Sequence, residues 1–105
     1  MNAFNLESRS SELRAVCHIV LSSPELTRKA LPHINIERES IDWDGVFSND
    51  FAGGHLAAMT IAKALWRDQI TTKGDPFDRA FAMDLKLRQA VLVAIAIRWG
   101  VDKPF

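Results

Sequence analysis

The stretch that decides the fold is LKLRQAVLVAIAIRW, residues 85–99, which is apolar at all but four of its positions. Wound as a helix, it presents apolar side chains around more than half of its circumference. A second stretch, HLAAMTIAKALW at residues 55–66, has the same character. Because helices of this composition are normally buried on more than one side, we expect the two to pack together at the middle of the molecule.

The ends of these two helices carry recognisable signals. We expect the earlier helix to run over residues 53–68, starting at a pair of glycines. For the later one the sequence leaves two interpretations open: Asp84 caps a separate helix, or one kinked helix runs over residues 76–99. Gly100 suits the left-handed position that follows a helix, and Pro104 prevents continuation.

Two further helices are predicted before residue 33. The first is amphipathic and begins near Ser10 or Ser11, with apolar residues at the i, i+3, i+4 and i+7 positions of one face: Leu13, Val16, Cys17 and Val20. The second is short and opens at residues 23–25, where serine supplies a cap and proline suits the first helical position. Pro32 ends it, because the residue before a proline disfavours the helical conformation.

Residues 33–50 are expected to be irregular. Residues 33–36 alternate as a strand does, but we find no second strand to pair with them and predict an extended segment. Trp43 and Phe47 lie four residues apart and predict a single helical turn that covers one end of the core. The predicted fold class is therefore all-α: a compact small bundle of three longer helices, two or three short helices and this irregular segment.

Length and composition indicate one globular domain. The 105 residues suit a single domain over residues 1–105, of which we expect the first nine to be disordered. Thirteen basic residues balance thirteen acidic ones, and neither sign forms a block, so no nucleic-acid partner is expected. The lone Cys17 and the absence of a signal-peptide pattern predict a cytoplasmic protein. The longest apolar run, residues 90–97, is too short to span a bilayer, so no membrane partner is expected.

The residues that could hold a metal lack the required spacing. The three histidines, His18, His33 and His55, form no pattern of paired metal ligands, and Cys17 and His18 would point about 100° apart on a helix. Asp42 resembles the start of a calcium loop, but an EF-hand needs an oxygen ligand, a glycine for the turn and a glutamate ligand where residues 46, 47 and 53 are Val, Phe and Gly. We expect no metal and no cofactor.

Other catalytic patterns are equally weak. The pair Gly53-Gly54 lacks the rest of a phosphate-binding motif, so we interpret it as close backbone packing against an aromatic residue, Phe51 or Trp43. Cys17 lies on the apolar face of its helix, where burial raises the pKa of a thiol and makes it inert. His55, in the first turn of a predicted helix, is the residue to inspect first if the protein is an enzyme.

The surplus of apolar surface leads to the functional hypothesis. Two helices that are apolar nearly all round leave more apolar surface than one small domain covers easily, and such surfaces mark sites of association. We therefore expect a non-catalytic interaction module, a small adaptor or inhibitor that binds another protein and self-associates as a homodimer. The alternatives are a small DNA-binding or regulatory helical protein, and an enzyme with a site near His55. The candidate interaction or pocket residues are Trp43, His55, Trp66, Arg88, Arg98 and Trp99.

Overall fold

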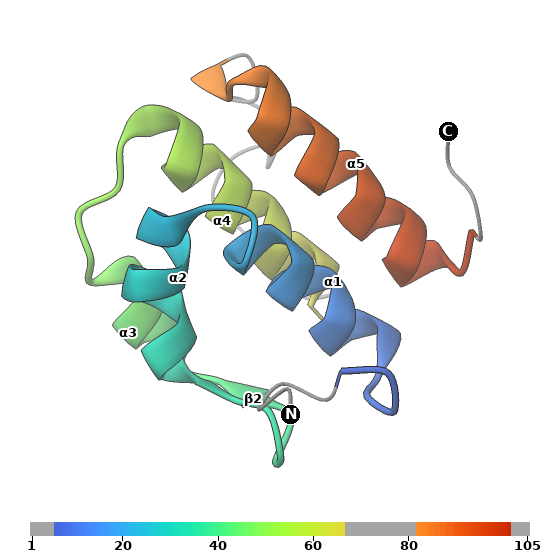
Figure 1. Cartoon of the computed structure of the whole chain (residues 1–105). Helices are drawn as coiled ribbons and strands as arrows, with labels where there is room; N and C mark the ends of the chain where they lie inside the picture. The colour runs from blue at the N-terminus through green and yellow to red at the C-terminus, as the bar shows by residue number, and fades with distance from the viewer. Residues whose placement is uncertain (1–5, 67–81, 102–105) are drawn as a thin grey trace.

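A computed structural model describes residues 6–66 and 82–101 of the chain, which fold compactly and are mostly helical. Two short strands form a small sheet in addition. The elements follow in the order α1 (Ser11–Val20), α2 (Pro24–Ala30), the 3-10 turn η1 (Leu31–His33), β1 (Ile34–Asn35), β2 (Ser40–Ile41), α3 (Trp43–Phe47), α4 (Gly53–Leu65) and α5 (Leu85–Trp99) (Figure 1).

Helix α1 lies at the centre and packs against both α4 and α5. Its predicted apolar face is completely buried, together with Ala15 and Ile19. The polar residues Glu12, Arg14 and His18 lie off that face and stay partly exposed, as the periodicity predicts. The sequence therefore determines α1 and its orientation toward the core.

Side-chain caps define where the helices begin. Ser10 accepts a hydrogen bond from the backbone N–H of Leu13 at 3.2 Å, and Ser23 caps α2 in the same way. The carboxylate of Asp84 accepts from the N–H of Leu87 at 2.8 Å while the Asp84 backbone is extended. Because an extended residue interrupts a helix, the alternative of one kinked helix over residues 76–99 is wrong, and α5 is a separate helix.

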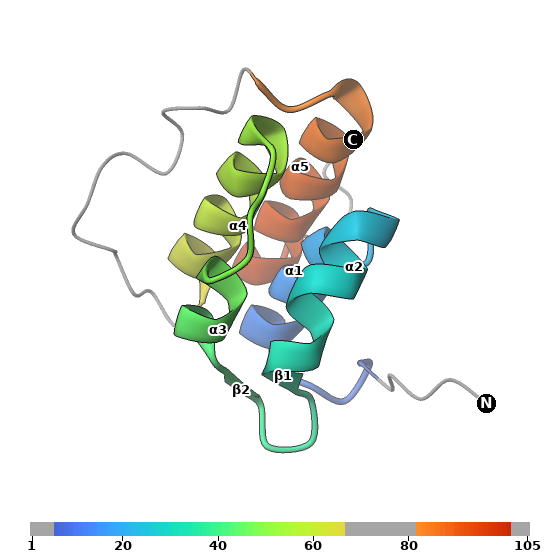
Figure 2. The ribbon, with the colours of Figure 1, turned by 90° about the vertical axis from the view of Figure 1, so that its left-hand side faces the viewer.

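Helices α4 and α5 run parallel to each other, and α1 runs antiparallel to both (Figure 2). Gly54, at the start of α4, touches the backbone of Ala82 and Met83, just before α5. At the other end, Arg98 Nε donates to the carbonyl oxygen of Leu65 at 2.9 Å. The connection at residues 67–81 lies outside the described residues, and with it the last two residues of the predicted 53–68 helix.

The contact at Gly54 corrects one prediction. We expected an aromatic neighbour at the glycine pair, but a Cβ on Gly54 would lie 2.7 Å from the carbonyl oxygen of Ala82. Backbone therefore packs against backbone at this point. The sequence could not reveal the neighbour, because it lies almost thirty residues further along the chain.

A small hairpin corrects a second prediction. Residues 34–35 are paired, antiparallel, with residues 40–41: Ile34 faces Ile41 and Asn35 faces Ser40. The side chain of Asn35 accepts a hydrogen bond from the N–H of Arg38 at 3.0 Å, which stabilises the turn, and Glu39 closes it with a positive φ of 49°. We missed the second strand because it has two residues and its turn lacks the usual glycine.

The end of α5 agrees with prediction. Gly100 adopts the left-handed conformation with φ of 72°. The N–H groups of Gly100 and Val101 donate to the carbonyl oxygens of Ile97 and Ala96 at 3.2 and 2.9 Å. This pattern satisfies the last carbonyls of the helix and ends it at Trp99.

Candidate functional site

The outer face of α5 carries three large apolar residues in water. Leu85, Leu92 and Trp99 are 70%, 48% and 73% exposed, and we call them the α5 stripe. Residues seven apart lie on the same side of a helix, so the three form one row along its axis. The opposite face of α5 carries Leu87 and Val91, which are buried against the core.

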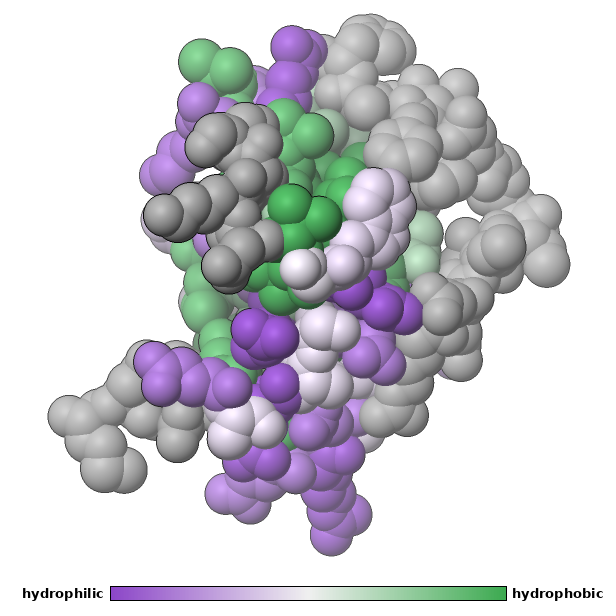
Figure 3. Space-filling view, turned by 90° about the vertical axis from the view of Figure 1, so that its right-hand side faces the viewer, coloured by the Kyte–Doolittle hydropathy of each residue, from purple (hydrophilic) through white to green (hydrophobic). Residues whose placement is uncertain are grey.

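The composition of α5 explains why this stripe exists. Apolar residues occupy eleven of its fifteen positions, and α1 and α4 contact α5 on its inner side. Apolar side chains on the remaining side therefore face solvent. Figure 3, which looks at this side of the molecule, shows hydrophobic side chains gathered in the middle of the described surface, with hydrophilic ones above and below them. Burying a leucine is worth roughly 1.5–3 kcal/mol, so a row of exposed large side chains is unfavourable unless something covers it.

The charges on α5 are of one sign. Lys86, Arg88 and Arg98 are its charged residues, and no Asp or Glu occurs at residues 85–101. Lys86 and Arg88 are exposed and lie on either side of the stripe, as their helical positions require. Arg98 is half-buried and directs its Nε to Leu65 on α4. The helix itself thus carries only basic charges, and the exposed carboxylate of Asp84 directly precedes its first turn.

The predicted site residues do not meet in one place. Arg88 and Trp99 lie on the outer side of α5, whereas Arg98 turns toward α4. Trp66 is buried at the end of α4, and His55 lies at the opposite end of that helix. We did not single out Leu85 and Leu92 from the sequence, although the spacing of seven through positions 85, 92 and 99 was a signal that could have identified them.

Trp43 is a core residue. Its ring is 8% exposed and stacks on Phe47, with 6.0 Å between ring centroids. Its Nε1 has no hydrogen-bond partner within the described part of the chain. The predicted helical turn over residues 43–47 is confirmed as α3, and Asp42 caps it by accepting from the N–H of Gly45 at 3.1 Å.

His55 belongs to a polar cluster that joins three segments. Its Nδ1 lies 3.0 Å from Oε2 of Glu25 on α2, and Lys29 Nζ donates to the same oxygen at 3.3 Å. The hydrogen bond from His55, together with that from Lys29, lowers the pKa of Glu25 below its usual value. Lys29 also donates to the carbonyl oxygen of Asp50 and lies over the ring of Phe51. The cluster thus holds α2 against the start of α4.

A small cavity of about 190 Å³ adjoins this cluster, lined by Ser22, Ser23, Pro24, His55, Asp84, Lys86 and Leu87. Several of the polar groups that line this cavity already form hydrogen bonds that hold the helices. The hydroxyl of Ser22 donates to the carbonyl oxygen of Ile19 at 2.6 Å, and Ser23 and Asp84 cap α2 and α5. No hydroxyl is paired with His55, so the nucleophile–base pair of a hydrolase is missing from this cavity as described.

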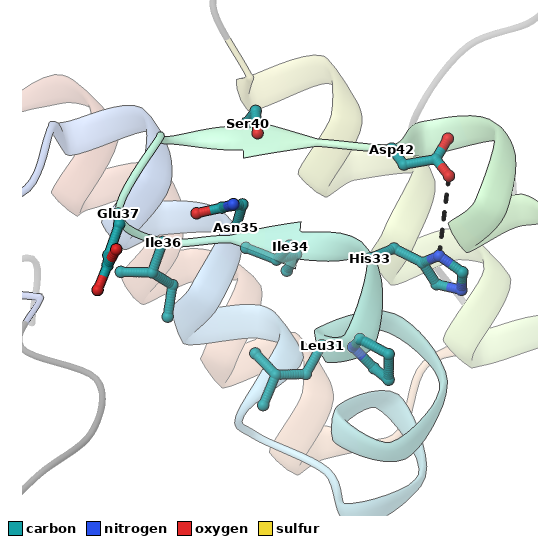
Figure 4. Close-up of a pocket in the computed structure, with 9 residues that line it drawn as sticks. Leu31, His33, Ile34, Asn35, Ile36, Glu37, Ser40 and Asp42 are labelled. Atoms are coloured by element: carbon teal, nitrogen blue, oxygen red, sulfur yellow. Dashed lines mark ion pairs between the residues drawn. The ribbon is translucent and has the colours of Figure 1, made fainter.

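A larger, shallow pocket of about 570 Å³ lies along the hairpin (Figure 4). His33 points toward Asp42 there, with 3.9 Å between Nδ1 and Oδ2. The other oxygen of Asp42 caps α3. This pair therefore fixes the base of the hairpin, and two side chains alone do not make a structural metal site.

The other described side chains form no further reactive site. Within residues 6–66 and 82–101, no group of three or more His, Cys, Asp or Glu side chains could hold a metal ion. Cys17 is fully buried, and burial raises the pKa of its thiol to about 11. None of the helices described here has the length and hydropathy needed to cross a membrane.

Comparison with known proteins adds no assignment. No protein-family model matches the chain, and neither curated proteins nor solved structures gave a match. Among the described residues, the α5 stripe is the feature whose large apolar side chains the fold leaves exposed.

Proposed function

We propose that this chain is a non-catalytic protein-interaction module that binds another polypeptide through the α5 stripe. The observation that carries the proposal is the row of Leu85, Leu92 and Trp99, each exposed over about half of its surface or more and aligned on one helix face. Covering such a row removes apolar surface from water, which is the main favourable term in protein association. The basic residues beside it resemble the polar rim of an interface.

Peptide selection on the full chain tests this proposal. A displayed library of twenty-residue peptides is selected on the wild type, and the recovered peptides are measured against Leu92→Asn and Leu21→Asn. Both substitutions replace an exposed leucine by a neutral polar residue, but Leu21 lies at the end of α1 and is not part of α5. We expect Leu92→Asn to weaken binding about tenfold or more and Leu21→Asn to leave it unchanged. Peptides that bind both variants equally would refute the proposal.

The sequence also predicts that the chain self-associates as a homodimer. Sedimentation equilibrium over micromolar concentrations measures it directly. A dimer that Leu92→Asn disrupts and Leu21→Asn preserves would identify a second copy as the occupant of the stripe. A monomer throughout that range would contradict the homodimer while leaving a different protein partner open.

The alternatives have less support. DNA binding needs a contiguous basic face, but Lys86 and Arg88 are followed along the outer side of α5 by Leu92 and Trp99. Salt-dependent binding of duplex DNA that is lost in Lys86→Gln/Arg88→Gln would favour this alternative. An enzyme with a site near His55 would need a reacting group beside the imidazole. The group that lies beside this imidazole is the carboxylate of Glu25, which is already paired with Lys29.

A further inference from the structure

From the geometry of the α5 stripe we infer that its partner is a second copy of this chain, packed so that the two α5 helices run antiparallel. The two Leu92 side chains meet at the two-fold axis, and Leu85 of each copy contacts Trp99 of the other. The inference rests on the proposed function and names the occupant of the stripe and its orientation. It has three grounds: the register of the stripe, the distribution of charge along α5, and the size of the surface.

The stripe is complementary to itself when its direction is reversed. Leu85 and Trp99 lie seven residues before and after Leu92, which is about 10.5 Å along the axis at 1.5 Å per residue. A two-fold symmetric dimer uses the same patch on both copies, so this patch must be self-complementary. A two-fold axis at Leu92 reverses the row, and each of its three residues then meets a large apolar residue of the other copy. Two straight rows of this kind stay in contact at the small crossing angle that is common for helix pairs.

The charges along α5 favour the antiparallel orientation over the parallel one. The exposed charges lie at its start, where the carboxylate of Asp84 precedes the helix and Lys86 and Arg88 follow in its first turns. The only later charged residue of α5, Arg98, directs its Nε to the carbonyl oxygen of Leu65. A parallel pair places each exposed charge beside the same charge of the other copy, and like charges facing each other act against association. An antiparallel pair places the charged start of each helix beside the uncharged outer side of the other helix's end.

The remaining electrostatic terms do not oppose a second copy. The chain has thirteen basic and thirteen acidic residues and no net charge, so long-range repulsion between copies is small. Arg88 also interacts within its own chain, and the choice of orientation is unaffected because it depends on where the charges lie along the helix. Association is therefore left to the apolar contact.

The size of the surface fits a reversible dimer of folded monomers. A stable interface buries about 1,600 Å² in total, and one pair of helices in contact along about 21 Å buries less. The core of each copy is complete without the other, because Leu87 and Val91 on the inner side of α5 are already buried within the chain. We therefore expect association at micromolar concentrations and a folded monomer below them.

Disulfide trapping on the full chain tests the orientation together with the occupant. Cys17→Ala removes the native thiol, and Leu85→Cys or Trp99→Cys then introduces a single thiol at either end of the stripe. When the two variants are mixed under mild oxidation, an antiparallel pair brings the two introduced thiols together at one end, while the central leucines and the Leu85–Trp99 contact at the other end stay intact. We expect the mixed disulfide, identified by its mass, to form at least tenfold faster than either same-variant disulfide, because docking raises the effective concentration of the two thiols.

Controls separate docking from random collision. Leu92→Asn, added to both cysteine variants, removes the central contact and should slow the mixed disulfide about tenfold. Leu21→Cys places an exposed thiol outside α5 and gives the rate of cross-linking by collision. Circular dichroism verifies that each variant remains folded, which is expected because the substituted side chains at positions 21, 85, 92 and 99 are exposed. Cys17→Ala alone is the reference for the buried position.

The outcomes distinguish this inference from the proposed function. Same-variant disulfides that form faster than the mixed one would overturn the antiparallel pair in favour of a parallel one. A monomer in sedimentation equilibrium, with every disulfide forming at the rate of Leu21→Cys, would overturn the second copy as the partner, and peptide selection would then decide whether the stripe docks another polypeptide. A dimer that persists in Leu92→Asn would also overturn the inference, because its interface would lie elsewhere.

Discussion

Helices α1 and α5 pack against each other but differ in how many of their apolar residues are buried. In α1 the apolar residues fall on one side and are buried, and the polar residues occupy the rest. In α5 apolar residues occur on every side, so burying Leu87 and Val91 leaves Leu85, Leu92 and Trp99 in solvent. The comparison shows that an apolar sequence does not by itself make a buried helix, because the position of the helix in the fold limits how many of its sides are covered.

The positions of the two helices explain the difference. Helix α1 contacts α4, α5 and α2, so its neighbours surround the apolar face. Helix α5 contacts α1 and α4, which lie on its inner side. The surplus apolar surface predicted from the sequence therefore gathers on α5. Four measurements test this contrast.

Thiol reactivity should show the largest difference between the two helices. Cys17 is buried in α1, and its pKa is raised to about 11, so it is protected and predominantly protonated at neutral pH. We expect a thiol reagent to modify it about a thousandfold or more slowly than an exposed thiol, since opening the core requires at least about 5 kcal/mol. Cys17→Ala/Leu92→Cys places the thiol on α5 and should react rapidly. Similar rates for the two proteins would contradict the described burial.

Truncation of a leucine side chain should give the second-largest difference between the two helices, measured as the loss in the free energy of unfolding. Leu13 on α1 is fully buried, and Leu13→Ala is expected to lower the free energy of unfolding by about 2–5 kcal/mol through lost burial and a cavity. Leu92→Ala on α5 removes a half-exposed side chain and should cost about 0.5 kcal/mol or less. Urea titration of both variants measures the two values. A large loss for Leu92→Ala would mean that its side chain supports the fold.

Substitution of a glycine tests how α5 is positioned against α4. Gly54→Ala places a Cβ 2.7 Å from the backbone oxygen of Ala82 and should cost about 1–3 kcal/mol, because backbone must move. Gly53→Ala is the matched control, since its Cβ would lie 3.8 Å from the nearest atom, and we expect it to be neutral or slightly stabilising. Equal stability of the two variants would contradict the close approach.

The pH dependence of stability should give the smallest effect. Burial lowers the pKa of His18 on α1 below its usual value of 6.5. The unfolded chain then binds the proton more readily, so the free energy of unfolding is constant above pH 6.5 and decreases as the pH falls through 6.5. His18→Gln should reduce this slope. Measurements between pH 5 and 8 avoid the range below 4.5, where protonation of Glu25 removes a stabilising pair. An unchanged slope in the variant would show that His18 is not responsible.

Most helices were predictable because their signals are local. The spacing of Leu13, Val16, Cys17 and Val20 predicted α1, the cap at position 23 predicted where α2 begins, and Gly100 predicted where α5 ends. For the start of α5, a cap at Asp84 was one of two interpretations that the sequence left open. The hairpin and the contact at Gly54 were missed. Both depend on which distant segments meet, and neither leaves a periodic pattern in the sequence.

The sequence predicted that an apolar surface would be left uncovered, but not which residues would form it. The excess of apolar residues indicated an uncovered surface, and Arg88 and Trp99 were named among its residues. Trp43 and Trp66 were also named, but they are buried, because a large aromatic residue in the sequence looks the same whether it fills the core or faces solvent.

The sequence by itself determined which segments are helices, because periodicity and capping act between residues a few positions apart. Only the tertiary structure decided which side of α5 faces water. Its apolar residues lie all around the axis, so no local pattern distinguishes the inner side from the outer one. That choice was made by the neighbours: α1 and α4 cover one side and leave Leu85, Leu92 and Trp99 on the other.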